Sequence, residues 1–160
     1  MTIALYAGSF DPITLGHMDI IKQASEIFDK VIIGVAYNPE KKGCISVSDR
    51  VNLIKEAVKN FSNCEIYSYD GLTVNFAKKH NAKVLVRGLR NSADLEYEMQ
   101  LAKINSDLAN DIKTVFLTSK AEYNYISSSA VRELLSNNCD ISKYVPKCVQ
   151  KYFADRLCKN

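Results

Sequence analysis

The alternation of short apolar runs with longer amphipathic stretches constrains the fold of this chain more than any other feature. Runs of this length that are rich in β-branched residues are typical of strands covered on both faces of a sheet. The sequence KVIIGVA is the clearest example, because nearly every residue in it is apolar. Patterns of this kind predict strands at Thr2–Ala7, Lys30–Ala36, Cys64–Tyr69, Lys83–Arg87 and Lys113–Thr118.

The stretches between these runs have apolar residues three or four positions apart, which is the periodicity of an amphipathic helix. Ile20 and Ala24 share one side of the first stretch. Ser46 with Asp49 resembles a capping box, and Ser92 is a candidate N-cap. The predicted helices are His17–Phe28, Val47–Phe61, Leu72–His80, Ser92–Leu108, Ser127–Leu135 and Pro146–Leu157.

Strands separated by helices predict right-handed βαβ units, and therefore a doubly wound parallel sheet of five strands with helices on both faces. The 160 residues contain no linker or internal repeat, so residues 1–160 are expected to form a single domain. In such a sheet, ligands bind beyond the carboxyl ends of the strands. The segments expected at that edge are Gly8–His17, Tyr37–Gly43, Asp70–Thr73, Arg87–Arg90 and Ser119–Ser129.

The overall charge argues against a nucleic-acid partner. The 21 Lys and Arg residues against 18 Asp and Glu give a net charge of only +3, so any basic site must be local. No apolar run approaches the length of a membrane span, and Met1–Ala4 lacks the charged region of a secretory signal. We therefore expect a soluble cytoplasmic protein with no membrane partner.

The cysteine pattern indicates neither a zinc site nor a disulfide framework. The five cysteines are scattered, none pairs as Cys-x-x-Cys, and His17 and His80 are the only histidines. We interpret the thiols as free in a reducing compartment. The cysteines are Cys44, Cys64, Cys139, Cys148 and Cys158.

The first loop at the predicted binding edge, Gly8–His17, suits an anion. Its glycines let the backbone approach a ligand closely, and the following helix presents free N–H groups to a phosphate. His17, in the first helical turn, can donate to a phosphate oxygen. The spacing matches neither a P-loop nor a dinucleotide fingerprint. The alternatives are an ordinary βα loop with a turn at Asp11-Pro12, and a surface histidine.

Further polar groups lie at the same edge. Arg87 and Arg90, on either side of a glycine, suit bidentate binding of phosphate. Ser127–Ser129 offer three hydroxyls at a helix start, where one suffices as an N-cap. Lys41 adds a positive charge after the second strand, whereas the carboxylates of Asp94–Glu98 are by default helix-start charges. Taken singly, each group also fits a solvated charge or a simple cap.

Two of these segments resemble the signature motifs of the nucleotidylyltransferase superfamily. They are G-S-F-D-P with T-L-G-H over Gly8–His17, and I-S-S-S-A-V-R over Ile126–Arg132. The block R-G-L-R-N-S-A-D-L-E-Y-E-M-Q-L-A at Arg87–Ala102 is similar to the distinctive segment of the bacterial phosphopantetheine adenylyltransferases, and Asn75–Ala77 also fits. The resemblance extends over almost the whole chain and departs at Ala7, where the family often has proline.

The resemblance implies a Rossmann-like α/β fold, often hexameric. It also implies a reaction of ATP with 4′-phosphopantetheine, with Mg²⁺, that gives dephospho-coenzyme A and pyrophosphate. His17 would stabilise the transition state, and Lys41 and Arg90 would be further catalytic residues. The residues implied to bind ATP are Ser9, Phe10, His17, Gly88, Leu89, Arg90, Glu98, Tyr123, Asn124, Tyr125, Ile126, Ser127, Ser128 and Ser129. Those implied to bind phosphopantetheine are Ser9, Lys41, Thr73 and Arg87, and no protein ligand of the metal is implied.

A phosphate acceptor would need no general base, because a phosphate monoester with a second pKa of about 6 is largely ionised at neutral pH. Catalysis would rest on positioning and on stabilisation of charge. Three alternatives remain: a nucleotidyltransferase for nicotinamide or nicotinate mononucleotide or with a cytidylyl donor, a non-catalytic adenine-nucleotide sensor, and an RNA-binding module. The Arg87–Glu98 block disfavours the first, and the small net charge disfavours the last.

Overall fold

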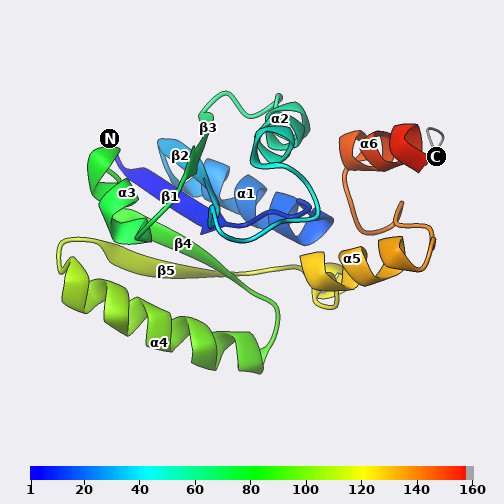
Figure 1. The fold of residues 1–160 in the computed structure, drawn as a ribbon. Coiled ribbons are helices and arrows are strands. Elements are labelled where there is room, and N and C mark those ends of the chain that lie inside the picture. Colours follow the sequence, from blue (N-terminus) through cyan, green and yellow to red (C-terminus); the bar gives the residue numbers. More distant parts are fainter. Residues whose placement is uncertain (158–160) are drawn as a thin grey trace.

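The computed structural model describes residues 1–157, which form a five-stranded parallel sheet with the order β3-β2-β1-β4-β5 (Figure 1). The chain begins in the middle of the sheet, and the direction of winding reverses between β1 and β4. The doubly wound sheet predicted from the sequence is therefore confirmed. The strands are β1 (Ile3–Gly8), β2 (Lys30–Ala36), β3 (Cys64–Tyr69), β4 (Val84–Leu89) and β5 (Lys113–Thr118).

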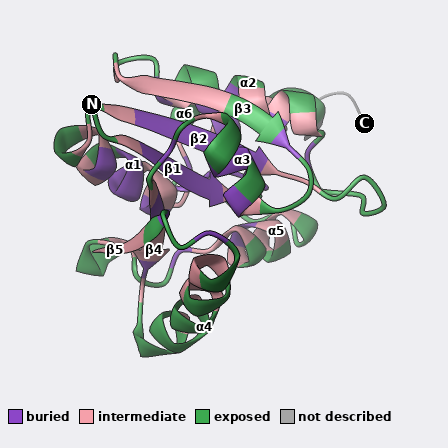
Figure 2. Cartoon of the chain, turned by 90° about the vertical axis from the view of Figure 1, so that its left-hand side faces the viewer, coloured by how far each residue is buried: buried purple, intermediate pink, exposed green. Residues whose placement is uncertain are grey.

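Helices cover both faces of the sheet, as expected. Successive side chains of a strand point to opposite faces. In β1, Ala4 and Tyr6 accordingly join one buried cluster, and Leu5 and Ala7 join another. The first cluster is shared with residues of α1, α2, α5 and α6, and the second with α3 (Figure 2). The helices are α1 (Leu15–Ile27), α2 (Val47–Ala57), α3 (Thr73–Lys79), α4 (Ser92–Leu108), α5 (Ser128–Ser136) and α6 (Lys147–Leu157), with a short 3-10 helix at Ala121–Tyr123.

The predicted end of α2 and the predicted cap of α4 were wrong. The helix α2 stops at Ala57 rather than Phe61, because Phe61 donates its backbone N–H to Val58 in a tight turn while both side chains still pack against the core. The N-cap of α4 is Asn91 rather than Ser92. The Asn91 side chain accepts from the backbone N–H three residues later at 3.0 Å.

The predicted start of α2 is confirmed in part. Ser46 is the N-cap, and its hydroxyl accepts the backbone N–H of Asp49 at 3.2 Å. The Asp49 carboxylate does not complete a capping box. It accepts instead from the hydroxyl of Tyr152 at 2.9 Å and from Arg156 at 3.2 Å. This contact joins α2 to α6, which is a tertiary interaction that local sequence does not reveal.

The helix α4 is the least covered element of the fold. None of its residues is fully buried, and it lies along β4 and β5 at the edge of the molecule (Figures 1 and 2). Tyr97 is 60 % exposed and Met99 is 56 % exposed. Several of its apolar side chains therefore face outward, and its carboxylates Asp94 and Glu98 pair with arginines at the end of β4.

Four of the cysteines, Cys44, Cys64, Cys139 and Cys148, are free thiols, as expected, and Cys158 lies outside the described residues. Within residues 1–157, no helix combines the length and the apolar character that crossing a membrane requires.

Candidate active site

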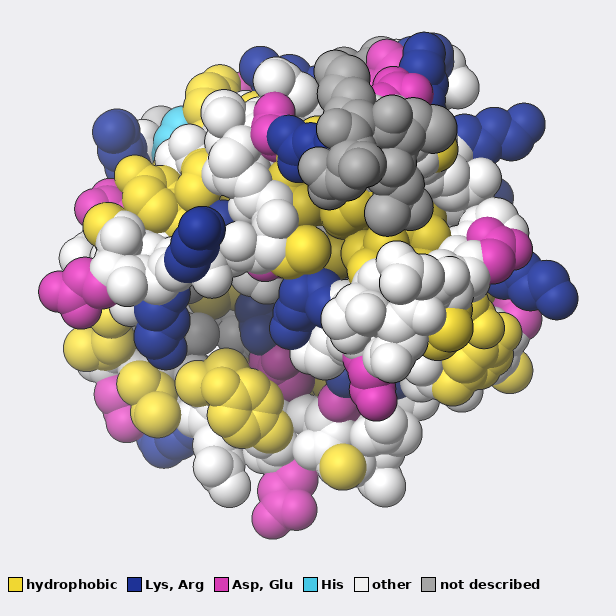
Figure 3. Space-filling view, turned by 45° about the vertical axis from the view of Figure 1, so that its right-hand side comes forward, with side chains coloured by type: hydrophobic (Ala, Val, Ile, Leu, Met, Phe, Trp, Pro, Cys, Tyr) yellow, Lys and Arg dark blue, Asp and Glu magenta, His cyan; other side chains and the backbone are white. Residues whose placement is uncertain are grey.

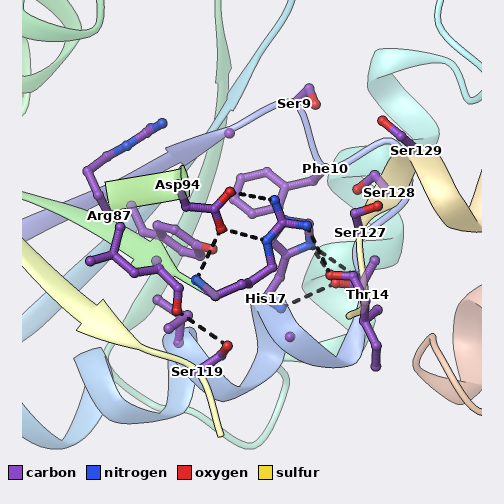
Figure 4. A pocket seen from close by; sticks show the side chains of 18 of the residues that line it. Ser9, Phe10, Thr14, His17, Arg87, Asp94, Ser119, Ser127, Ser128 and Ser129 are labelled. Carbon is purple, nitrogen blue, oxygen red and sulfur yellow. Dashed lines mark hydrogen bonds and ion pairs between the residues drawn. The ribbon is translucent and has the colours of Figure 1, made fainter. Parts of the chain in front are cut away.

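A cavity of about 340 Å³ opens where β1 and β4 end, at the point where the winding of the sheet reverses (Figure 4). Its lining comes from residues 8–10 after β1, from 87–90 at the end of β4 and from 127–129 at the start of α5. His17, from α1, completes the wall between the first and last of these segments. The fold thus brings together three of the five segments that the sequence places at the binding edge, namely Gly8–His17, Arg87–Arg90 and Ser119–Ser129.

The loop after β1 turns Phe10 inward. Phe10 has φ 47°, in the left-handed region that is costly for a residue with a side chain, and it is only 1 % exposed. Its ring packs edge-on against Tyr6 and against His17, with ring centroids 5.4 and 5.0 Å apart. Gly8 leaves room for this ring, because a Cβ there would lie 3.2 Å from it. Phe10 therefore packs against the imidazole from the protein interior.

His17 is held as a neutral hydrogen-bond donor. It is the third residue of α1, and its side chain completes a capping box with the N-cap Thr14. Thr14 donates its backbone N–H to Nδ1 at 3.1 Å. Because Nδ1 accepts this bond, the ring proton lies on Nε2. Burial, with a smaller contribution from the Arg90 guanidinium, lowers the pKa of His17 to about 4. At neutral pH the cavity therefore contains an uncharged imidazole with one N–H free for a ligand.

Arg87 is bound by a carboxylate of α4. Its Nε and Nη2 donate to Glu98 at 2.5 and 2.6 Å, and its Nη1 donates to the Ala7 carbonyl at 2.9 Å. The Glu98 side chain is 12 % exposed, so this bidentate pair is well shielded from water. The pair fixes the plane of the guanidinium group and offsets part of its charge toward a ligand.

Arg90 is paired in the same way with Asp94. Its Nε and Nη2 each donate to the carboxylate at 2.9 Å, as the dashed lines at Asp94 show in Figure 4. Burial alone would raise the pKa of Asp94, but the bonds from Arg90 keep it below its ordinary value. Figure 3 shows basic and acidic side chains side by side in a recess of one face. An anion must therefore share both arginines with carboxylates.

The three serines at the start of α5 have different partners. Ser127 is the N-cap and accepts the backbone N–H of Ala130 at 3.0 Å, so α5 begins one residue later than predicted. Ser128 donates to the Pro12 carbonyl at 2.8 Å, which ties α5 to the loop after β1. Ser129 accepts from Arg132 at 3.0 Å. The first turn of α5 thus presents its backbone N–H groups and the Ser127 and Ser129 side chains at the cavity.

Several cavity residues were not assigned a role from the sequence. Arg132 lines the cavity and donates to the Asp11 carbonyl at 2.7 Å. Its position three residues after Ser129 in the same helix was the signal for it, since residues three apart are neighbours on a helix surface. The sequence pattern indicates only a helix-start charge for Asp94 and only a loop position for Ser119. Both line the cavity.

Five predicted site residues lie outside the cavity lining. Lys41 is exposed on the loop after β2, and the Thr73 hydroxyl is 2.8 Å from that of Tyr69 on β3. The Asn124 amide is 3.1 Å from the Ser119 hydroxyl, at the edge of the site. The remaining two are Tyr123 and Tyr125, the latter 67 % exposed. The structure thus brings His17, both arginines and the serines together but leaves Lys41 apart.

Sequence comparisons show which known proteins this chain resembles. The model of the cytidylyltransferase-like family matches residues 5–134. A protein named phosphopantetheine adenylyltransferase from Clostridium perfringens is 45 % identical over 98 % of this chain and 96 % of its own length. Proteins of the same name from Lachnoclostridium phytofermentans and Vesicomyosocius okutanii are each 47 % identical, over 98 % and 97 % of this chain and 96 % and 98 % of theirs.

A solved structure supports the fold alone. A Vibrio parahaemolyticus protein assigned as a nicotinate-nucleotide adenylyltransferase superposes with a TM-score of 0.72, over 96 % of this chain and 99 % of that one. Its sequence is 20 % identical, which is too distant to transfer a substrate.

Proposed function

The chain belongs to the phosphopantetheine adenylyltransferase family of cytidylyltransferase-like proteins, and on that premise we propose that it transfers the adenylyl group of ATP to 4′-phosphopantetheine. The products are dephospho-coenzyme A and pyrophosphate, and the reaction is a step of coenzyme A biosynthesis. The observation that carries the proposal is the cavity in which neutral His17, Arg87, Arg90 and the start of α5 converge.

The cavity suits a reaction that needs charge stabilisation rather than a base. Its carboxylates, Asp94 and Glu98, are both paired with arginine, and the acceptor phosphate is ionised without help. The Nε2–H of His17 would donate to the α-phosphate as negative charge develops there and pyrophosphate leaves. A donor placed at developing charge is worth about 3–4 kcal/mol of transition-state stabilisation.

The nucleotide would lie on the α5 side of the cavity. The N–H groups of α5, the hydroxyls of Ser127 and Ser129 and the remaining N–H groups of Arg90 would bind the β- and γ-phosphates. The hydroxyl of Ser128 would act indirectly, because it donates to the Pro12 carbonyl. The base and ribose would lie against Gly88, Leu89 and residues 123–126. Two other residues expected to bind ATP also act indirectly in this proposal, since Phe10 supports His17 and Glu98 fixes Arg87.

The acceptor would lie on the β1–β2 side. Ser9 lines the cavity between the two halves, where its hydroxyl would contact both substrates. Arg87 and Lys41 would bind the acceptor phosphate, and Thr73 would line the rest of this subsite. Gly8 pairs with Val35 in the sheet, so the loop with Lys41 leaves the same edge as Ser9. Closure of this loop over the acceptor would bring Lys41 to the phosphate.

The described residues include no cluster of three or more His, Cys, Asp or Glu side chains that could hold a metal. Residues 1–157 therefore offer no protein cage for Mg²⁺, and we propose that the ion enters with the ATP phosphates and keeps most of its waters. Bound there, it would neutralise phosphate charge.

We also propose a cytoplasmic homo-oligomer, a hexamer by resemblance. The apolar side chains exposed on α4 support association between copies, because exposed apolar surface of this kind marks interaction sites. These side chains are Leu95, Tyr97, Met99, Ile104 and Leu108. Light scattering coupled to gel filtration measures the mass directly, and a monomer at all concentrations would contradict the proposal.

A pyrophosphate assay tests the proposed reaction against its alternatives. ATP and Mg²⁺ are supplied with phosphopantetheine, with nicotinamide or nicotinate mononucleotide, or with no acceptor. We expect pyrophosphate only with phosphopantetheine, in the wild type and in the control His80→Ala, which changes the histidine outside the cavity lining. Release with a mononucleotide would point to another nucleotidyltransferase, and ATP binding without release would point to a sensor.

A further inference from the structure

Asp11 is a buried charge that the proposed mechanism leaves unused. Asp11 lies in the loop that follows β1 and is only 7 % exposed. The two carboxylate oxygens accept the backbone N–H groups of Cys44 and Ile45, each at 2.8 Å. Its carbonyl accepts from Arg132 of α5 at 2.7 Å. One residue thus joins the loop after β1 (residues 9–14, here called the catalytic loop) to α5 and to the end of the loop after β2.

Arg50 makes a second bridge between the same two loops. It is 6 % exposed, and it donates to the Ser9 carbonyl at 2.8 Å and to the Ile45 carbonyl at 3.1 Å. Gly43 lies against both bridging side chains. A Cβ at Gly43 would lie 2.9 Å from Oδ2 of Asp11 and 3.3 Å from Nη2 of Arg50, so no side chain fits there.

Beyond this anchor the loop is open. Residues 38–44 are exposed, and the hydrogen bonds of its turn are internal, from the N–H groups of Glu40 and Lys41 to Asn38. Lys41 precedes Cys44 by three residues, so its Cα stays within about 10 Å of the anchored end in any conformation. The bonds of Asp11 and Arg50 therefore keep Lys41 near the end of its loop that is joined to the loop of Ser9.

We propose that Asp11 is a positioning residue for the acceptor, clamping the base of the Lys41 loop to the catalytic loop so that Lys41 meets the acceptor phosphate beside Ser9. The inference rests on the proposed function. Bonds from backbone N–H groups to a carboxylate are stronger than neutral ones. A loop fixed at its base also loses less entropy when it closes than a loop that is free there.

The test is Asp11→Asn, which keeps the shape but turns an NH₂ group toward one of the two backbone N–H groups. We expect the KM for phosphopantetheine to rise at least tenfold, while the dissociation constant for ATP changes less than twofold. In the Lys41→Ala background, Asp11→Asn should change that KM less than twofold. Such non-additivity arises only if the carboxylate acts through the lysine.

Asp19→Asn is the matched control. Asp19 is also 7 % exposed and accepts the backbone N–H of Lys120 at 3.0 Å, on a different loop. We expect it to lower stability without changing the acceptor KM. Should Asp11→Asn fold poorly, Gly43→Ala presses on the same contact and should raise the same KM.

The outcomes separate the inference from the proposed function. A wild-type protein that releases no pyrophosphate with phosphopantetheine would reject both. An active wild type with an unchanged acceptor KM in both Asp11→Asn and Gly43→Ala would reject the positioning role alone. Additive effects of Asp11→Asn and Lys41→Ala would also reject it.

Discussion

Replacing His17 by glutamine should make the protein less sensitive to acid. In the folded chain the pKa of His17 is lowered to about 4 from its ordinary value of 6.5, first by burial and then by Arg90. Between these values the unfolded state binds a proton that the folded state does not, so stability falls as pH falls. Glutamine does not titrate, and at the third helical position it can still accept the Thr14 N–H in a capping box.

The magnitude follows from the same pKa. Each pH unit below 6.5 lowers the free energy of unfolding by about 1.4 kcal/mol while the folded imidazole stays neutral. From pH 7 to pH 4.5 the wild type should therefore lose about 2 kcal/mol more free energy of unfolding than His17→Gln, after allowance for partial protonation of the folded state near pH 4.5. Carboxylates that titrate in this range contribute equally to both proteins and cancel in the comparison.

Urea unfolding at the two pH values measures this difference. The chain contains no tryptophan, so far-ultraviolet circular dichroism is the suitable probe. Both proteins are compared at the same concentration, so that any association affects them alike. Equal losses of stability in wild type and His17→Gln would show that the folded imidazole has an ordinary pKa, and would refute the neutral donor.

Three further substitutions test the site by kinetics. His17→Ala should lower kcat about 10²- to 10³-fold with a much smaller effect on ATP binding; equal losses in both would count against a transition-state role. Lys41→Ala should raise the KM for the acceptor and leave that for ATP, and unchanged acceptor kinetics would remove Lys41 from the site. Arg87→Ala should raise the acceptor KM and lower stability, because it leaves Glu98 unpaired. Adding Glu98→Ala should restore part of the stability in urea unfolding but not the KM.

The strands were predictable from the sequence because burial of one or both faces of a sheet requires apolar residues at alternate or successive positions. The strands β2, β3 and β5 have the predicted bounds, since their residues alternate or stay apolar up to a polar loop. Helix ends were less predictable. Asn91 and Ser92 are both good caps, and the extended backbone at Asn91, with φ −155°, decides between them. That conformation depends on how α4 meets β4.

The position of the site was also predictable, because a doubly wound sheet puts the loops after its strands at one edge. Its long-range contacts were not. The ion pair of Arg87 and Glu98 joins residues 11 apart, and the hydrogen bond from Ile45 to Asp11 joins residues 34 apart, so packing alone brings them together. The place of the Lys41 side chain was not predictable for a different reason. Its loop is exposed, and no contact with the core fixes where its side chain lies.

In the proposed reaction this cavity joins the α-phosphate of ATP to the phosphate of phosphopantetheine. Phosphorus NMR of a reaction containing ATP, Mg²⁺ and phosphopantetheine in equal amounts observes that bond directly. We expect new phosphoanhydride signals of the pyrophosphate-bridged product, dephospho-coenzyme A, to grow one to one with free pyrophosphate. Conversion of ATP to ADP, or to AMP with the acceptor phosphate unchanged, would contradict it.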